Sequence, residues 1–151
     1  MILLDANILL YAYDRGSIHN EFMKAWLDDR LNGVAKVGIP WATTLAFARI
    51  VTNPRIYTSP VASSTAWQQA RAWLSAPAAW VPQPTERHID MIDRIISSTS
   101  VQANDIPDVH LGALAIEHGL KLCSTDADFA KYADVTWINP LDERQEEVDR
   151  S

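Results

Sequence analysis

Four aspartates are spaced so that they could share one site. Asp5 follows an apolar segment at residues 1–4, Asp126 follows a second short apolar run, and Asp128 and Asp108 fall in the first turns of expected helices. Carboxylates that converge raise one another's pKa unless a cation balances them. Oxygen ligands without cysteine or histidine suit a hard ion, Mg²⁺ or Mn²⁺. Such an ion activates water and neutralises phosphate, so the pattern predicts metal-assisted phosphodiester hydrolysis.

Each aspartate also has a structural interpretation. Asp126 can cap the helix that follows it, and Asp128 favours the positive end of that helix dipole. Asp108, three residues after Asp105, can belong to a capping arrangement at a proline-containing helix start. Asp5 is harder to explain in this way, because an acid at the end of so apolar a strand usually serves a ligand or a buried turn. The four together favour a shared site.

Short apolar segments alternate with helical patterns along the chain. The expected strands are residues 1–4, 34–39, 79–82, 121–125 and 135–139. The expected helices are residues 7–16, 17–32, 40–52, 63–75, 86–98, 108–119 and, more briefly, 126–132. This alternation implies parallel pairing through right-handed crossovers, and hence an open α/β sheet covered by helices on both faces. Ligands bind beyond the carboxyl ends of such strands, which places the aspartates at one edge.

One helical pattern carries a specific packing expectation. In residues 86–98, four isoleucines at core spacing are expected to face the interior: Ile89, Ile92, Ile95 and Ile96.

Length and composition indicate one globular domain. The chain has 151 residues, of which 48% are hydrophobic and 21% charged. We expect a single domain at residues 1–141 and an acidic polar tail at 142–151, as a frayed helix or a disordered end. The net charge of -6 opposes a general electrostatic grip on nucleic acid. The objection weakens because five acids and two arginines in "LDERQEEVDRS" account for half of the excess.

Signals for export or membrane insertion are missing from the sequence pattern. Asp5 interrupts the apolar start after four residues, and no basic segment precedes it. The single cysteine, Cys123, cannot form an internal disulfide, which suits a reducing compartment. We therefore expect a cytoplasmic protein.

Three motifs resemble the PIN-domain family: "LLDANILLYA", "IPDVHLGALAIEHG" and "LCSTDADFAKY" followed by "WINPL". More narrowly they resemble the VapC ribonuclease toxins of toxin-antitoxin pairs, and "IPWATTLAFARIVTNPRIY" is similar to a branch abundant in mycobacteria. The resemblance implies a PIN-like three-layer α/β/α sandwich with a mainly parallel sheet of four to five short strands. It also implies an endoribonuclease that uses Mg²⁺ or Mn²⁺ to cleave structured RNA of the tRNA or rRNA class. A cognate VapB-type antitoxin would hold it inactive, and it would usually be a homodimer.

The resemblance also assigns roles by position. Asp5, Asp108 and Asp126 match the family's metal ligands, and Asp128 matches a further acid that supports the site directly or through water. Two small polar residues, for which turn and cap roles remain open, fall near the metal in the family: Asn7 and Thr125.

One departure concerns the helix after the second strand, where the family commonly has a glutamate. This sequence has no acid between Asp29 and Glu86. The helix offers other polar residues instead: Thr43, Thr44 and Arg49. The lost negative charge could weaken metal affinity, favour one ion over two, or require Asp105 to help.

Arginines and tryptophans are the candidates for RNA contacts. Arg49 and Arg55 can bind phosphate in a bidentate manner, although exposed arginines without a specific role are the alternative. Tryptophans can stack on unpaired bases. Four of them lie in patterns that indicate core instead: Trp26, Trp67, Trp73 and Trp137. Two others fit either role: Trp41 and Trp80.

Two other functions are alternatives to the nuclease. A phosphatase of the haloacid-dehalogenase type usually has a second aspartate two residues after the first, where this chain has Asn7, and a late lysine, for which Lys121 is poorly placed. The other rival is a PIN fold that lost catalysis with its glutamate and only binds RNA or a protein partner.

Overall fold

The computed structural model describes residues 1–151, and at its centre is a five-stranded, all-parallel sheet in the order β3-β2-β1-β4-β5. The strands are β1 (Ile2–Leu4), β2 (Val37–Gly38), β3 (Ala79–Trp80), β4 (Lys121–Cys123) and β5 (Trp137–Ile138). Leu4 pairs with Cys123, and Leu3 pairs with Gly38. The carboxyl ends of β1, β2 and β4 therefore lie at one edge, and the predicted parallel α/β sheet is confirmed.

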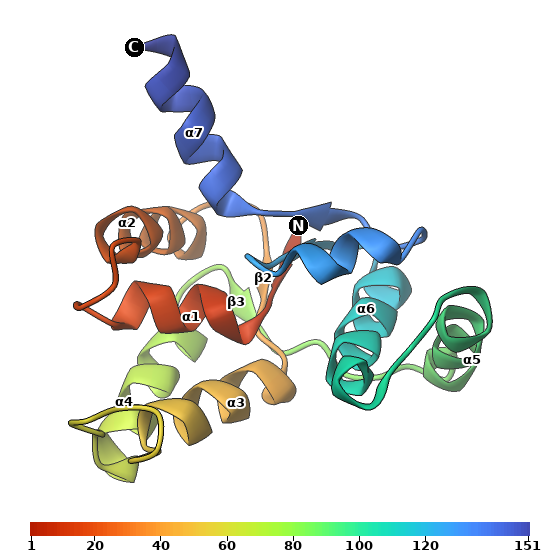
Figure 1. Ribbon diagram of the computed structural model, residues 1–151, viewed down its shortest axis with the longest axis horizontal. Helices are drawn as coiled ribbons and strands as arrows, with labels where there is room; N and C mark the ends of the chain where they lie inside the picture. The colour runs from red at the N-terminus through yellow and green to blue at the C-terminus, as the bar shows by residue number, and fades with distance from the viewer.

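Helices cover both faces of this sheet, so the fold has three layers (Figure 1). The α-helices are α1 (Ala6–Tyr13), α2 (Asn20–Leu31), α3 (Trp41–Val51), α4 (Ser63–Leu74), α5 (His88–Ser98), α6 (Ile106–His118) and α7 (Pro140–Arg150). Two short 3-10 helices complete the list: η1 (Ala103–Asp105) and η2 (Ala127–Lys131). Figure 1 shows α1 to α4 on one side of the strands and α5 and α6 on the other. None of these helices combines the length and the apolar composition needed to cross a bilayer.

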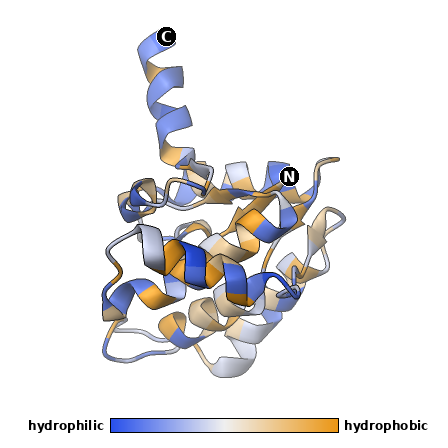
Figure 2. Cartoon of the chain, turned by 90° about the vertical axis from the view of Figure 1, so that its right-hand side faces the viewer, coloured by the Kyte–Doolittle hydropathy of each residue, from blue (hydrophilic) through white to orange (hydrophobic).

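Two hydrophobic cores hold the layers together, one on each face of the sheet. Leu4 and Cys123 pack with α1 to α4, whereas their chain neighbours Leu3 and Leu122 pack with α5 and α6. This division follows from the alternation of side chains along a strand. All four are fully buried, and each large aliphatic side chain contributes about 1.5–3 kcal/mol by burial. In Figure 2 the strands carry hydrophobic colour, as expected for a sheet covered on both faces.

The acidic C-terminal segment forms a helix that projects from the body of the protein (Figures 1 and 2). Helix α7 begins at Pro140, behind the cap Asn139, and runs through the expected tail. At its base Glu143 accepts a hydrogen bond from the indole nitrogen of Trp26 at 3.2 Å and lies 3.6 Å from Arg30. Beyond this contact the helix is mostly hydrophilic (Figure 2).

The core prediction for the isoleucines of α5 was wrong for two of them. Only Ile95 is buried and Ile92 is half-buried, whereas Ile89 is 73% exposed and Ile96 is 45% exposed. Helix α5 lies at the outside of the fold and packs mainly on α6. Contact with a single neighbour buries a narrower stripe than contact with a sheet, so spacing alone overestimated the buried face.

A buried carboxylate fastens the start of α5 to α6. The Glu117 side chain accepts hydrogen bonds from the Thr85 backbone nitrogen at 2.9 Å, from the Thr85 hydroxyl at 2.6 Å, and from His88 Nδ1. His88 Nε2 in turn lies 3.0 Å from His110 Nδ1. Burial by itself would raise the pKa of Glu117, but the hydrogen bonds from His88 and Thr85 outweigh it and lower that pKa.

We expect Glu117→Gln to destabilise the protein by about 1–3 kcal/mol at pH 7, because a buried charged acceptor is lost. A carboxylate whose pKa is lower in the folded than in the unfolded protein stabilises the fold at pH values above the unfolded pKa, here 4.5. This stabilisation is lost as the pH falls through the folded pKa. The variant should therefore lose stability less steeply than the unmodified protein between pH 5 and pH 3. Urea unfolding between pH 3 and pH 7 measures the loss of stability and its pH dependence, with a substitution of an exposed acid, Glu86→Gln, as control. Equal losses of stability per pH unit in Glu117→Gln and the unmodified protein would contradict the stabilising role of the Glu117 charge.

Candidate active site

Asp5 stands at the junction between β1 and α1. It caps α1, because its Oδ1 accepts a hydrogen bond from the Ala6 backbone nitrogen at 2.7 Å. Its own backbone nitrogen donates to the carbonyl of Cys123 at 3.0 Å, which extends the pairing of β1 with β4 by one residue. The expected position at the end of the strand is thus the observed one.

Ser124 and Asn7 hold the second carboxylate oxygen of Asp5. The Ser124 hydroxyl donates to Asp5 Oδ2 at 2.8 Å, and Asn7 Nδ2 donates to the same oxygen at 3.2 Å. Ser124 Oγ also accepts from Asn7 Nδ2 at 2.9 Å and from the Asp126 backbone nitrogen at 3.0 Å. Asn7 Oδ1 accepts from the Thr125 backbone nitrogen at 3.1 Å. The network joins the ends of β1 and β4 and fixes the orientation of Asp5.

Ser124 was not singled out from the sequence, although it is completely buried. A serine after a strand is equally typical of an ordinary turn, so residue type gave no signal. Only the pairing of β4 with β1 brings its hydroxyl to Asp5.

Asp126 and Asp128 lie together at the start of η2. Asp126 Oδ1 caps this helix by accepting from the Asp128 backbone nitrogen at 2.9 Å, and Asp126 Oδ2 has no protein partner. Asp128 is exposed in the first turn. The capping interpretation is therefore confirmed for Asp126, and one of its oxygens stays available for a ligand.

The pKa of Asp108 is affected by more neighbouring acids than that of Asp5. It is half-buried in the first turn of α6, and its pKa is raised to about 6. Burial is the largest cause of this shift, followed by four nearby negative charges: Asp5, Asp126, Asp105 and Asp128. The pKa of Asp5 is also raised, by burial first and by the charge of Asp126, against the hydrogen bond from Ser124. Acids from separate segments thus share one electrostatic site.

Asp105 is engaged in structural contacts beside this site. Its Oδ2 accepts from the Gln102 backbone nitrogen and from Lys131 Nζ, both at 2.9 Å. The hydrogen bond from Gln102, and then Lys131, lower the pKa of Asp105. This capping box and ion pair order the turn that leads into α6.

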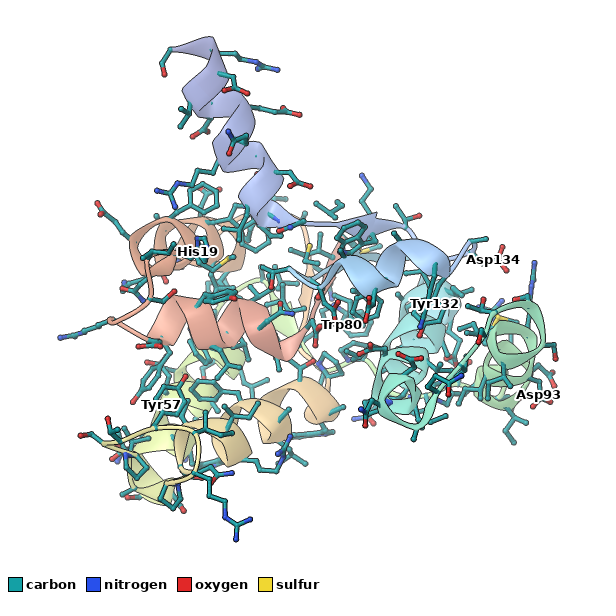
Figure 3. The ribbon with its side chains drawn as sticks, viewed as in Figure 1. His19, Tyr57, Trp80, Asp93, Tyr132 and Asp134 are labelled. Atoms are coloured by element: carbon teal, nitrogen blue, oxygen red, sulfur yellow. The ribbon has the colours of Figure 1, made fainter.

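Tyr132 is a second neighbour that sequence reasoning missed. Figure 3 shows it where η2 passes α6. Its hydroxyl is buried without a hydrogen-bond partner. Burial raises its pKa, and the charges of Asp105 and Asp108 raise it further, against the effect of Lys131. A tyrosine after a lysine gave no sign of this placement, because it depends on the packing of η2 against α6.

The first turn of α3 borders the site without supplying an acid. Thr43 donates its hydroxyl to the Leu4 carbonyl at 2.6 Å, immediately before Asp5. Thr44 is buried, and its hydroxyl has no partner. The family commonly has a glutamate in this helix, and here its first turn carries threonines instead.

The two candidate phosphate contacts, Arg49 and Arg55, lie away from the aspartates. Both are exposed, and neither forms an ion pair. Arg49 lies in the last turn of α3 and Arg55 in the loop that follows. The carboxylate edge is at the other end of α3, where Thr43 contacts Leu4.

The donor chemistry of the carboxylate edge fits a hard divalent cation. The available ligands are oxygens, and a cation would relieve the repulsion that, in addition to burial, raises the pKa of Asp108. The side chains do not form a preorganised metal site, because no three acidic, histidine or cysteine side chains are close enough together to hold an ion. Binding would therefore draw the carboxylates inward.

Comparison with known proteins identifies the family. Residues 2–135 match the PIN domain. The chain is 39% identical to Ribonuclease VapC37 of Mycobacterium tuberculosis over 140 residues, covering 93% of this chain and 97% of that protein. This chain belongs to the PIN-domain family, in its VapC branch. It is also 33% identical to Ribonuclease VapC33 of Mycobacterium tuberculosis, covering 95% of this chain and all of that protein.

Solved structures support the PIN fold at lower identity. FitAcB from Neisseria gonorrhoeae matches with a TM-score of 0.66 and 22% identity, over 93% of this chain and 99% of that one. VapBC-1 from nontypeable Haemophilus influenzae matches with a TM-score of 0.66 and 12% identity, over the same shares. The predicted family and the predicted three-layer PIN-like fold are both confirmed.

We expect Asp108→Asn to stabilise the metal-free PIN domain at pH 7.5 by about 1 kcal/mol, allowing for solvent screening of this half-buried group. The pKa of Asp108 is 3.8 in the unfolded protein and about 6 in the folded protein. Its charge therefore costs stability, and the cost grows as the pH rises from the unfolded pKa through the folded pKa. The gain should vanish near pH 4. Unfolding in the presence of a chelator measures it, and Asp93→Asn on the far side of α5 serves as the control (Figure 3). An equal gain at both pH values would contradict the electrostatic origin.

Proposed function

We propose that this PIN domain is an endoribonuclease toxin whose Mg²⁺ or Mn²⁺ ion is held by Asp5, Asp108 and Asp126, with Asp128 assisting. The observation that carries the proposal is the hydrogen-bond network in which the Ser124 hydroxyl donates to Asp5 and accepts from the Asp126 backbone nitrogen, so that acids after β1 and β4 are held at one edge. The raised pKa of Asp108, caused first by burial and then by Asp5 and Asp126, agrees with this arrangement. Relatives bearing the name ribonuclease align over nearly the whole chain, which supports the choice of RNA as substrate.

The protein's own residues prepare the site for phosphodiester hydrolysis. Ser124 and Asn7 fix one oxygen of Asp5, and the Ala6 backbone nitrogen fixes the other. The Asp128 backbone nitrogen orients Asp126 and leaves its second oxygen accessible. A divalent cation, when bound, supplies charge neutralisation for the phosphate and lowers the pKa of water.

The comparisons also support a protein partner. Several of the matching structures are toxin-antitoxin complexes, among them VapBC2 from Rickettsia felis and a complex from Klebsiella pneumoniae. We infer that a cognate VapB-type antitoxin binds this chain, and that the free toxin is a homodimer. Structured RNA of the tRNA or rRNA class is the proposed substrate.

A binding module without catalysis is the second candidate. Two observations favour it: α3 carries no acid, and the carboxylates do not stand as a ready metal cage. In that case the protein would bind RNA or its partner and leave the phosphodiester bond intact.

Cleavage of total cellular RNA by antitoxin-free protein separates the two candidates. We expect cuts at a few sites with Mg²⁺ or Mn²⁺, none with chelator, and a loss of at least about 100-fold in Asp5→Asn, because an activating ligand is removed. Asparagine also caps helices well, and thermal unfolding of the variant checks that it remains folded. Sequencing of the new RNA ends is the measurement, with Asp93→Asn as the active control. RNA bound but uncut under every cation condition would establish the binding module instead.

A further inference from the structure

Tyr132 carries a buried hydroxyl that has no role in the hydrolysis described above. The residue is only 3% exposed, and its hydroxyl oxygen has no hydrogen-bond partner. A hydroxyl that is removed from water without a partner costs stability, and such groups are rare in folded proteins. A phenylalanine ring would fill the same space without this cost. The hydroxyl therefore needs an explanation apart from packing.

The Tyr132 ring lies beside the start of α6. It belongs to the same hydrophobic core as Val109 of that helix, and Figure 3 shows it where η2 passes α6. Lys131 Nζ lies 5.4 Å from the centre of the ring and donates to Asp105 Oδ2 at 2.9 Å. Asp105 is the N-cap residue of α6, and Asp108 lies in the first turn of the same helix. These contacts hold the tyrosine next to the turn that carries a proposed metal ligand.

The Tyr132 hydroxyl is a hydrogen-bond donor at neutral pH. Burial raises its pKa, against the effect of Lys131, and the charges of Asp105 and Asp108 raise it further. A hydroxyl with a raised pKa keeps its proton, and that proton needs an acceptor. Lys131 offers donors only, so it cannot be that acceptor. The candidates are the two carboxylates.

Asp108 needs a donor more than Asp105 does. Asp105 already accepts from the Gln102 backbone nitrogen and from Lys131, and these bonds lower its pKa. Asp108 is half-buried, and its pKa is raised by burial and by four neighbouring acids with no hydrogen bond to offset them. A buried donor without an acceptor thus lies near a carboxylate without a donor.

We propose that Tyr132 is a positioning residue whose hydroxyl donates a hydrogen bond to Asp108 when that carboxylate turns to bind a divalent cation. In the structure the two groups are not hydrogen-bonded to each other. A carboxylate has two oxygens, so one can bind the ion while the other accepts from Tyr132. Such neighbours fix the orientation of metal ligands. The inference rests on the proposed function for the cation at Asp108 and deepens it by naming the residue that orients this ligand.

Thermal unfolding with and without Mn²⁺ separates the hydroxyl from the ring. In chelator the hydroxyl has no partner, so Tyr132→Phe should raise the unfolding midpoint by about 2–4 °C. At an equal Mn²⁺ concentration the parent should gain more stability than the variant, because it binds the ion more tightly. A residue needed only for packing would change both midpoints by the same amount.

Calorimetric titration of antitoxin-free protein with Mn²⁺ measures the affinity directly. We expect Tyr132→Phe to weaken Mn²⁺ binding about 10-fold to 100-fold. The same change should keep its full effect in Asp105→Asn, and should alter the affinity by less than about 2-fold in Asp108→Ala, where the acceptor is gone. The matched control is Tyr57→Phe, in the loop after α3 on the opposite side of the molecule, which should bind as the parent does (Figure 3).

The outcomes distinguish this inference from the proposed function. Equal Mn²⁺ affinity in Tyr132→Phe and a parent that binds Mn²⁺ would overturn only the role of Tyr132. Loss of the effect in Asp105→Asn, with the full effect kept in Asp108→Ala, would overturn the choice of Asp108. A parent that binds no Mn²⁺ would reject this inference and the metal-dependent function together. Weaker Mn²⁺ binding in Tyr132→Phe, in a protein that never cleaves RNA, would uphold the inference and reject only the proposed catalysis.

Discussion

The burial of the Asp5 carboxylate between the ends of β1 and β4 is the constraint around which the fold is built. A partly buried charge needs hydrogen-bond donors, and Ser124, Asn7 and the Ala6 backbone nitrogen supply them. These donors come from both sides of the junction, so the pairing of β1 with β4 and the start of α1 are fixed together. Two cores, one on each face, hold the strands in the register that this network requires.

The acidic edge is electrostatically unfavourable and is held by the rest of the structure. Burial and neighbouring charges raise the pKa of both Asp5 and Asp108. The opposite arrangement is found at Glu117, where buried donors lower the carboxylate pKa and bind α5 to α6. The same chain thus contains one carboxylate that stabilises the fold when charged and others whose burial and mutual repulsion cost stability when they are charged. Strain of this kind at a functional site is typical of proteins whose activity costs stability.

The segment between the two acidic regions has the opposite character. Residues 30–85 lack acids, and α3 presents threonines to the carboxylate edge where its family resemblance leads one to look for a glutamate. The missing acid lowers the negative charge beside the carboxylate edge, and two exposed tryptophans, Trp41 and Trp67, lie on α3 and α4. The core prediction for Trp67 was wrong, because the buried stripe of α4 is formed by Ala66, Ala70 and Trp73 instead.

The sequence by itself determined the parallel α/β architecture, the PIN family and the position of Asp5 at the end of β1, because these depend on local periodicity and on motifs. Asp126 lies three residues beyond the end of β4, as the cap of η2. Tertiary structure alone decided what each side chain contacts. Asn7 and Ser124 are 117 residues apart in the chain, and only strand pairing brings them into hydrogen-bond contact. The exposure of Ile89 and Trp67 likewise depended on how much neighbouring surface each helix meets. Periodicity records which residues share a face, whereas the burial of that face depends on a partner that the local sequence does not contain.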